Sequence, residues 1–286
     1  MRIIITGANG QLGRELQRVL ADHVLLATDL GPATAAMDIC DYRTTLETVS
    51  EFRPDVVIHA AANTNVDGCE RDPDKAFEVN ALGTQNVALA CQHVGAAMVY
   101  ISTDYVFDGE KGEPYLELDP PNPVSAYGRS KLAGEQYVKM LLTRFYIVRT
   151  AWLYSQHGSN FVKWALKASQ EQAQLVGVVD QVGSPTNAAD LAHSIARLIE
   201  HERYGIYHFT NEGSCSRYDL LVRILELAGR PTFVLPMTTP EFLSRYPLPA
   251  RRPANSTLRN FSAARSLGIT LRHWDEALQE LMCSLV

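Results

Sequence analysis

The stretch M-R-I-I-I-T-G-A-N-G-Q-L-G, residues 1–13, decides the fold that this sequence predicts. Its first six residues form a short run rich in β-branched side chains, which is typical of a buried strand. Glycines follow at positions 7, 10 and 13, and apolar residues then recur at helical spacing through Leu20. A strand, a glycine turn and a helix in this order let the backbone approach a pyrophosphate, whose charge faces the helix N–H groups. The stretch therefore predicts a dinucleotide site, although its spacing is G-x-x-G-x-x-G and not the standard G-x-G-x-x-G.

The next predicted strand, residues 24–28, ends at Asp29. An acidic side chain about 20 residues after the glycines suits a hydrogen bond to the adenosine ribose of NAD. A 2′-phosphate would be repelled there unless a base compensated for the charge, and Arg14 could do so. The sequence therefore leaves NADH and NADPH both open. A solvated turn aspartate is the other interpretation of Asp29.

Helical and strand patterns alternate along the chain, which predicts an α/β fold. The expected strands are residues 55–59, 144–150, 174–179 and 205–210 with one that begins near 99, and the expected helices are 41–52, one opening at 73, about 80–93, one starting after Ser125, 160–170, 190–200, 216–228 and 274–285. This order predicts a Rossmann-type, doubly wound parallel sheet with ligands at the carboxyl ends of its strands.

A second motif follows the strand that begins at Val99. Ser102–Asp104 places polar side chains at the carboxyl end of that strand, and the next helix carries Tyr127 and Lys131 four residues apart on one face. A free phenol titrates near ~10, and a nearby ammonium lowers its pKa, so Tyr127 could give a proton to a carbonyl oxygen as hydride reaches the carbon. Thr103 supplies a second hydroxyl for the same oxygen. An ordinary helix with one aromatic and one solvated lysine is the alternative.

Five longer strings carry a family resemblance: I-T-G-A-N-G-Q-L-G, S-T-D-Y-V-F, Y-G-x-S-K-L-A-G-E, R-T-A-W-L-Y and A-R-R-P-x-N-S. Together they resemble the dTDP-4-dehydrorhamnose reductase family of extended short-chain dehydrogenase/reductases over essentially the whole chain. The resemblance implies an NAD(P)H-dependent oxidoreductase that reduces the C4 ketone of dTDP-4-dehydro-β-L-rhamnose, the last step of dTDP-L-rhamnose biosynthesis. It makes Tyr127, Lys131 and Thr103 the expected catalytic residues.

The resemblance also implies a cofactor site for NADPH or NADH. Its expected residues are Gly7, Gly10, Gln11, Leu12, Gly13, Asp29, Asp38, Ile39, Ala61, Ala62, Thr64, Tyr127 and Lys131. Asp38 and Ile39 would lie by the adenine, although a helix cap or turn explains this position nearly as well. The small side chains at residues 60–62 would let the backbone approach the cofactor closely.

The expected substrate residues are Val66, Thr103, Asp104, Tyr127, Trp152, Arg251 and Arg252. Residues 63–67 are expected to continue as a loop over the site, and the resemblance places the substrate near Val66. Trp152 would lay a flat apolar surface against a sugar ring, with a place in the core as its alternative. Arg251 and Arg252, beside Pro253, could pair with a nucleotide-sugar pyrophosphate. A surface ion pair explains the two arginines equally well.

The length of 286 residues allows one large or two intimate domains. We expect residues 1–150 to form the NAD(P)-binding Rossmann domain, with some later segments returning to it. Residues 151–286 are then expected to form mainly a smaller, nucleotide-sugar-binding domain.

The composition argues against several function classes. The net charge of −6, from 26 basic and 32 acidic residues without a basic tract, makes nucleic acid an unexpected partner. With no long apolar run and no signal peptide, the sequence predicts a cytoplasmic protein without a membrane partner. The five cysteines are expected to be reduced thiols. The histidines lack metal-ligand spacing, so Mg²⁺ rests only on the resemblance, and a monomer or a homodimer stays open.

Two other functions stay open. The first is an epimerase or dehydratase of the same fold, in which the bound cofactor is regenerated. A 4,6-dehydratase resembling this chain would carry Asp-Glu after the threonine, whereas here Tyr105 follows Asp104. The second is a non-catalytic NAD(P)-binding regulatory subunit, because fold and cofactor binding can outlive catalysis.

Overall fold

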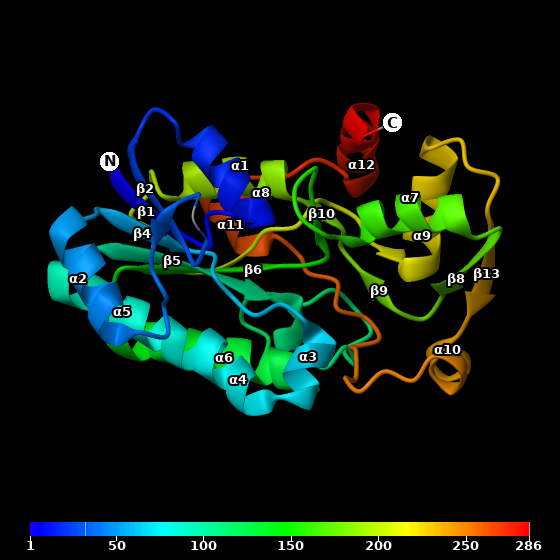
Figure 1. Ribbon diagram of the computed structural model, residues 1–286, viewed down its shortest axis with the longest axis horizontal. Helices are drawn as coiled ribbons and strands as arrows, with labels where there is room; N and C mark the ends of the chain where they lie inside the picture. The colour runs from blue at the N-terminus through cyan, green and yellow to red at the C-terminus, as the bar shows by residue number, and fades with distance from the viewer. Residues whose placement is uncertain (32, 286) are drawn as a thin grey trace.

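A seven-stranded parallel sheet forms the centre of the computed structural model, which describes residues 1–31 and 33–285 (Figure 1). Its strands are β1 (Arg2–Thr6), β2 (Val24–Asp29), β3 (Ala35–Ala36), β4 (Val56–His59), β5 (Ala97–Thr103), β6 (Phe145–Thr150) and β11 (Gly205–His208), in the order β11-β6-β5-β4-β1-β2-β3. All neighbouring pairs are parallel. The order reverses between β1 and β4, the point at which doubly wound sheets bind ligands. The predicted Rossmann-type fold is confirmed.

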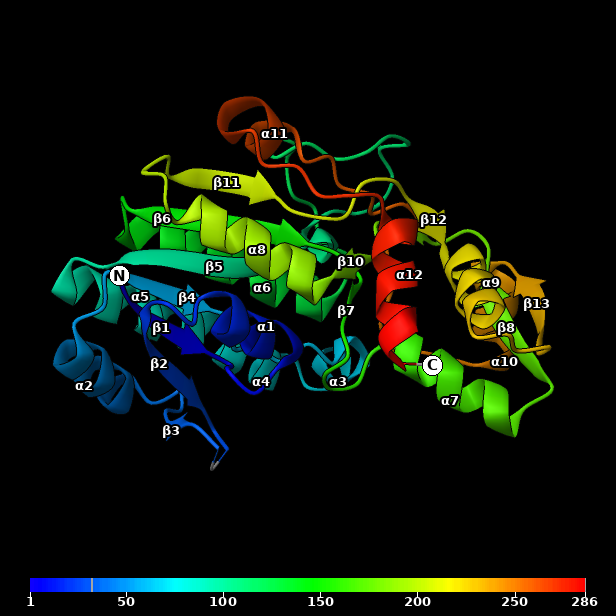
Figure 2. The same cartoon turned by 90° about the horizontal axis from the view of Figure 1, so that it is seen from above.

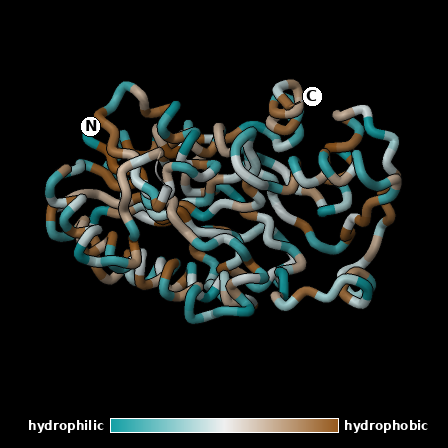
Figure 3. Tube along the Cα trace, in the orientation of Figure 1, coloured by the Kyte–Doolittle hydropathy of each residue, from teal (hydrophilic) through white to brown (hydrophobic). Residues whose placement is uncertain are grey.

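Helices cover both faces of this sheet (Figure 1). One face carries α1 (Gln11–Val19), α8 (Ala188–Leu198) and α11 (Phe261–Leu267), and the other carries α2 (Tyr42–Phe52), α5 (Gly83–Val94) and α6 (Ala126–Leu141). Because side chains alternate along a strand, Ile3 and Ile5 pack with the first set while Ile4 packs with the second. Hydrophobic and hydrophilic residues accordingly alternate along the covering helices (Figure 3).

Short helices connect β4 to α5 and follow β5. They are α3 (Val66–Arg71), α4 (Pro73–Phe77), the π-helix η1 (Glu78–Leu82) and the 3₁₀ helix η2 (Asp104–Val106). The predicted loop over residues 63–67 is wrong at its end, because Asn65 accepts a hydrogen bond from the Gly68 N–H and so starts α3 at Val66. The predicted helix near Asn80 begins with a π turn, a feature that often marks a functional region.

A second group of elements lies beside the carboxyl ends of the strands (Figure 2). It contains α7 (Phe161–Glu171), α9 (Arg217–Leu227), α10 (Thr239–Arg245), α12 (Trp274–Leu285) and the pairs β7 (Leu153–Tyr154) with β10 (Thr186–Asn187), β9 (Val182–Gly183) with β12 (Cys215–Ser216) and β8 (Gln174–Val178) with β13 (Phe233–Met237). The helices α7, α9 and α12 share an apolar cluster of their own. The chain returns to the large sheet after residue 150 through α8, β11 and α11.

Two properties of the described residues bear on the protein's surroundings. No helix among them is both long and apolar enough to cross a membrane. All five cysteines are free thiols, and three of them, Cys69, Cys91 and Cys215, are buried.

Candidate active site

The glycine turn between β1 and α1 is packed too tightly for side chains. Gly7 has a φ of +67°, and a Cβ there would lie 2.7 Å from the Ala61 Cα. A Cβ on Gly13 would collide with the Gly7 carbonyl oxygen. Gly10 caps α1 without a side-chain hydrogen bond, so the first-turn N–H groups of Gln11 and its successors lack a side-chain cap. Such a turn can hold a phosphate.

Asp29 bridges the end of β2 to this turn. Its carboxylate accepts hydrogen bonds from the Asn9 N–H at 2.9 Å and from the Leu30 N–H at 2.7 Å. Arg14 lies at the same turn, where its Nε donates to the Asn9 carbonyl oxygen at 3.1 Å. The structure thus brings Asp29 and Arg14 to the turn as expected, and the ribose contact of Asp29 stays a prediction.

The other expected cofactor residues differ in how their side chains are used. Asp38 is exposed and accepts from the Cys40 N–H at 2.9 Å, which is the turn interpretation, while Ile39 is buried in the core. Leu12 is buried as well, so only its backbone is available to a ligand. Ala61, Ala62 and Thr64 lie in the loop after β4, and the Ala61 N–H donates to Thr6 Oγ1 at 3.2 Å. Contacts of all these residues with a cofactor stay predictions.

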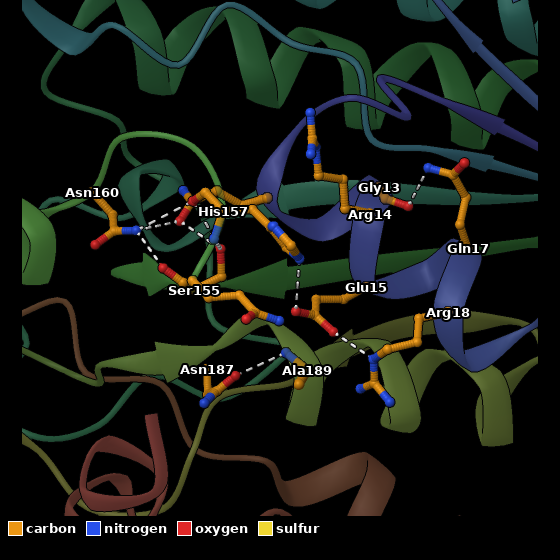
Figure 4. A network of polar contacts seen from close by, with 12 residues as sticks. Gly13, Arg14, Glu15, Gln17, Arg18, Ser155, His157, Asn160, Asn187 and Ala189 are labelled. Carbon is orange, nitrogen blue, oxygen red and sulfur yellow. Dashed lines mark hydrogen bonds and ion pairs between the residues drawn. The ribbon is translucent and has the colours of Figure 1, made fainter. Parts of the chain in front are cut away.

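Gln11 and Glu15 tie α1 to the loop that follows β7, and Figure 4 shows Glu15 beside His157 of that loop. Gln11 Oε1 accepts hydrogen bonds from Asn160 Nδ2 at 2.9 Å and Ser155 Oγ at 3.2 Å. The buried Glu15 carboxylate lies 3.5 Å from His157 Nε2 and 3.0 Å from Arg18 Nε. The expected cofactor residue Gln11 therefore also joins α1 to the segment that follows β7.

The structure brings Thr103, Tyr127 and Lys131 together at the carboxyl end of β5. Thr103 ends that strand, and α6 carries the other two residues one turn apart. Ser125 caps α6, as its hydroxyl accepts from the Gly128 N–H at 3.2 Å. All three side chains are nearly inaccessible, with exposed fractions of 5% for Thr103, 9% for Tyr127 and 2% for Lys131.

Burial changes the proton affinities of this group. It raises the pKa of Tyr127 well above its usual range, and an interaction with Thr103 opposes this rise. It lowers the pKa of Lys131 to about 7, while the charge of Glu135 opposes that fall. We expected Lys131 to lower the phenol pKa. Burial is the largest influence on the phenol and its pKa lies above the usual value here, so a lowering by Lys131 stays a prediction.

Asp104 is held by hydroxyl groups from both halves of the chain. Its Oδ2 accepts from Ser256 Oγ at 2.5 Å and its Oδ1 from Thr103 Oγ1 at 3.0 Å. Burial raises the pKa of Asp104 to about 6, and these hydrogen bonds limit the rise. Ser256 is a site residue that the sequence analysis missed, although it closes the quoted string A-R-R-P-x-N-S.

An internal ion pair lies one turn beyond Lys131 on α6. Glu135 receives the Arg149 guanidinium on both oxygens, at 2.8 Å from Nε and 2.7 Å from Nη2, and also accepts from Ser102 Oγ at 2.6 Å. Both partners are buried. No local sequence pattern indicates this pair, because Glu135 lies on α6 and Arg149 on β6.

Three of the expected substrate residues, Val66, Arg251 and Arg252, line a large cavity of about 1230 Å³. The other four, Thr103, Asp104, Tyr127 and Trp152, are not among its lining residues. Val66 lines it and packs in one apolar cluster with Tyr105 and Tyr127. Trp152 lies just past β6 with a φ of +45°, and the Arg217 Cζ lies 3.4 Å from the centroid of its ring. One face of Trp152 is therefore covered by a cation. Arg217 also lines the cavity, and no local sequence pattern predicts this, because only the tertiary fold brings α9 there.

The two arginines expected to bind pyrophosphate already have acidic partners. Arg252 makes a bidentate pair with Asp67, with Nη1 at 2.9 Å from Oδ1 and Nη2 at 2.6 Å from Oδ2, and it holds the pKa of that carboxyl below its usual value. Arg251 pairs with Glu110 at 3.1 Å, and both side chains are about two-thirds exposed. Both arginines line the cavity. For Arg251 the ion-pair interpretation describes the observed geometry.

The Mg²⁺ that accompanies the family resemblance has no matching ligand set. Across residues 1–31 and 33–285, no three His, Cys, Asp or Glu side chains gather as a metal-binding group. We therefore assign no residue to a metal ion.

Comparisons with known proteins identify the family of this chain. The family model described as RmlD substrate binding domain matches residues 1–286. A Bacillus subtilis protein, "Spore coat polysaccharide biosynthesis protein SpsK", is 41% identical, with 98% of this chain and 96% of that protein covered. A Clostridium acetobutylicum dTDP-4-dehydrorhamnose reductase structure is 45% identical with a TM-score of 0.94, covering 100% of this chain and 99% of that one. The Bacillus anthracis dTDP-4-dehydrorhamnose reductase structure in complex with NADP is 41% identical with a TM-score of 0.93, covering 99% of each chain. The chain therefore belongs to the dTDP-4-dehydrorhamnose reductase family.

Proposed function

We propose that this protein is an NAD(P)H-dependent reductase that converts the C4 ketone of dTDP-4-dehydro-β-L-rhamnose to the alcohol of dTDP-L-rhamnose. One observation carries the proposal: Thr103, Tyr127 and Lys131 lie buried together at the carboxyl end of the sheet. The large cavity reaches this group at Val66 and Tyr105, which share an apolar cluster with Tyr127. Family membership supplies the substrate class.

The nucleotide half has groups that fit a dinucleotide. The first turn of α1 lacks a side-chain cap, and the Gly7 turn leaves no space for a Cβ, so backbone alone lines this place. We assign the cofactor to the thirteen residues predicted from the sequence, with Lys131 on the nicotinamide ribose. The relative from Bacillus anthracis, solved with NADP, supports this assignment. When bound, the nicotinamide supplies the hydride.

The proton comes from Tyr127 in this proposal. Because burial raises its pKa, the phenol keeps its proton at neutral pH and can donate it to the oxygen at C4. In this structure Thr103 Oγ1 donates to Asp104 Oδ1 at 3.0 Å. In the proposal, the Thr103 hydroxyl donates instead to the oxygen at C4 when substrate is bound. The protein aligns the ketone with the hydride donor, and alignment is a large part of such catalysis.

The cavity is proposed to hold the nucleotide sugar. Its volume of about 1230 Å³ exceeds the roughly 300–1,000 Å³ of many small-ligand pockets. Arg217 lines it, is half-buried, and has no carboxylate of the described residues within 4 Å of its guanidinium. We therefore add Arg217 to Val66, Asp104, Trp152, Arg251 and Arg252 as a substrate residue, with its cation toward the phosphates.

We assign the cofactor to a domain built on residues 1–150 and the nucleotide sugar mainly to residues 151–286. The return of α8, β11 and α11 to the large sheet supports some sharing between the two. A cytoplasmic location is supported by the five free thiols, which suit a reducing compartment. A monomer and a homodimer are both compatible with the proposal, and sedimentation of the purified protein distinguishes them.

The test is loss of NADPH or NADH absorbance with a panel of 4-keto nucleotide sugars. We expect stoichiometric consumption with dTDP-4-dehydro-β-L-rhamnose and the alcohol as product. The variant Tyr127→Phe should lower kcat by roughly 10²–10⁴, the range for general acid catalysis, while cofactor affinity is kept. Undiminished turnover in Tyr127→Phe would remove Tyr127 from the mechanism.

The same experiment separates the two rival functions. An epimerase or dehydratase changes the sugar without net consumption of NAD(P)H. A regulatory subunit binds the cofactor but turns over none of the nucleotide sugars. Either result would overturn the reductase proposal.

A further inference from the structure

Tyr100, three residues before Thr103 on β5, contacts Lys131 in two separate ways. We propose that Tyr100 is a positioning residue, whose ring and hydroxyl hold the Lys131 ammonium at the reaction centre in its charged form. This inference rests on the proposed function, in which Lys131 contacts the nicotinamide ribose.

The first contact is between the ammonium and the ring. Lys131 Nζ lies 4.2 Å from the Tyr100 ring centroid, and neither side chain is more than 2% exposed. A buried charge needs compensation, yet no carboxylate of the described chain lies within 4 Å of this ammonium. Glu135 attracts it from one turn away, but both Glu135 oxygens already accept from Arg149. The electron-rich ring face is therefore the direct partner of the cation.

The second contact is between the hydroxyl and the helix backbone. Tyr100 Oη donates to the Lys131 carbonyl oxygen at 3.1 Å. Tyr100 therefore contacts Lys131 at its backbone through the hydroxyl and at its ammonium through the ring face. Gly134 leaves the space for this, because a Cβ there would collide with Tyr100 Oη and lie 2.7 Å from the Asn80 carbonyl oxygen. A tyrosine on a central strand and a glycine on the facing helix thus fix where Lys131 stands relative to the sheet.

Among the groups packed against Lys131 and Tyr100, Lys131 is the one that titrates near neutral pH. Asp104, held by Thr103 and Ser256, has a pKa of about 6, so it would act on the acidic side of a pH profile and not on the alkaline side. On β4, His59 stacks on Tyr100 at 5.8 Å, and burial together with the Lys131 charge lowers its pKa to about 3. His59 is held neutral between the hydroxyls of Thr6 at 2.7 Å and Thr84 at 3.1 Å. On α6, Tyr127 stays protonated because its pKa is raised, as is the pKa of Tyr100 on β5. The Glu135 carboxylate of α6 is paired with Arg149 of β6.

The test changes the charge distribution of the ring and keeps its shape. Tyr100→Phe removes the hydroxyl alone, and 3,4,5-trifluorophenylalanine incorporated in place of Tyr100 then weakens the ring face. The readouts are the NADPH dissociation constant and kcat, each followed against pH. If the ring stabilises the ammonium, fluorination makes Lys131 lose its proton at lower pH. NADPH affinity and kcat should then fall on the alkaline side at about one pH unit lower than in Tyr100→Phe, a tenfold effect.

A matched control uses another buried tyrosine of the sheet. Tyr146 on β6 packs on the opposite face, with α8, and no cation among the described residues lies over its ring. The same two replacements at position 146 should leave the pH dependence in place. Because Phe and its fluorinated form share one shape, folding is expected to survive, and thermal melting verifies it.

Each outcome decides the proposal. A shift at position 100 that is absent at position 146 supports it, and equal profiles for Phe and trifluorophenylalanine at position 100 would overturn it. If no variant consumes NADPH, the reductase proposal fails, whereas the pH dependence of NADPH binding still tests Tyr100. A loss of folding in the fluorinated protein but not in Tyr100→Phe would assign Tyr100 a packing role and also overturn the proposal.

Discussion

Two buried cations, Arg149 and Lys131, differ in the kind of partner that compensates their charge. Arg149 on β6 gives two hydrogen bonds to Glu135, and its guanidinium charge is cancelled inside the protein. Lys131, one turn before Glu135 on α6, has an aromatic ring in place of a carboxylate. Burial correspondingly lowers the pKa of Lys131 to about 7.

The difference separates a cation that holds the fold from one kept for a ligand. A paired buried charge has already offset its desolvation, so removing its partner is what destabilises the protein. A buried charge without an anion is a cost to the fold, and such groups gather at functional sites. Lys131 and Arg217 are of this second kind in our proposal, whereas Arg149 is of the first.

Lys131→Met removes the buried cation that has no carboxylate partner, and it should have the largest effect on activity. We expect kcat/KM to fall by roughly 10²–10⁴, because the reacting phenol and the ribose lose their cation. The melting temperature should stay equal or rise, because a costly buried charge is removed. Steady-state kinetics and calorimetry on the same preparation check both. A large loss of stability would instead make Lys131 a structural residue.

Arg149→Met removes the buried cation that is paired with Glu135, and it tests whether this pair stabilises the fold. It should lower the free energy of unfolding by about 3–5 kcal/mol, because Glu135 is left buried and unpaired. Urea unfolding measures this loss. The double variant Glu135→Leu with Arg149→Met should regain most of it, since both charges are gone. If Arg149→Met alone were as stable as the native chain, the pair would not be holding the fold.

Arg217→Gln extends the comparison to the large cavity. A hydrogen bond to a charged partner contributes about 1.5–3 kcal/mol, so KM for the nucleotide sugar should rise roughly 10- to 100-fold with little change in kcat. The matched control is Arg223→Gln on the same helix α9, because Arg223 is paired with Asp275 at 2.6 Å and is not among the residues that line the cavity. It should change KM by no more than about twofold. Equal effects of the two variants would contradict the distinction between free and paired arginines.

The smallest expected effect is the change in the free energy of unfolding with pH that the unpaired Lys131 causes. The folded-state pKa of Lys131 lies near 7 and its usual value is 10.5, so above pH 7 the unfolded chain holds more protons than the folded one. Stability from this group therefore rises with pH, by about 1 kcal/mol between pH 7 and pH 8. Urea unfolding at several pH values measures the slope. In Lys131→Met the slope should vanish, and its persistence there would assign it to another group.

The sequence predicts the fold well where its signals are local. The β-branched run before Gly7, the cap at Ser125 and the four-residue spacing of Tyr127 and Lys131 are each read within one turn or strand. They gave the doubly wound sheet and the centre of the site. The start of α3 at Val66 was missed because it depends on one side-chain cap, that of Asn65.

The rest of the site depends on contacts between distant residues. Asp104 and Ser256 are 152 positions apart, and Arg252 and Asp67 are 185 apart. No local pattern shows that one arginine of the pair 251–252 is already engaged by an aspartate, or that α9 brings Arg217 onto Trp152. The raised pKa of Tyr127 was likewise unpredictable from spacing, because desolvation depends on everything packed around the phenol.

The hydrogen bond from Ser256 to Asp104 has a consequence for synthesis of the chain. Strands β1 to β6 are complete by Thr150, so much of the sheet can pair while the polypeptide is still being made. The Asp104 carboxylate beside Thr103, however, gains its hydrogen bond from Ser256 only after residue 256 has been translated. A nascent chain can therefore acquire its nucleotide fold early, but its reaction centre is finished only after almost the whole protein has left the ribosome.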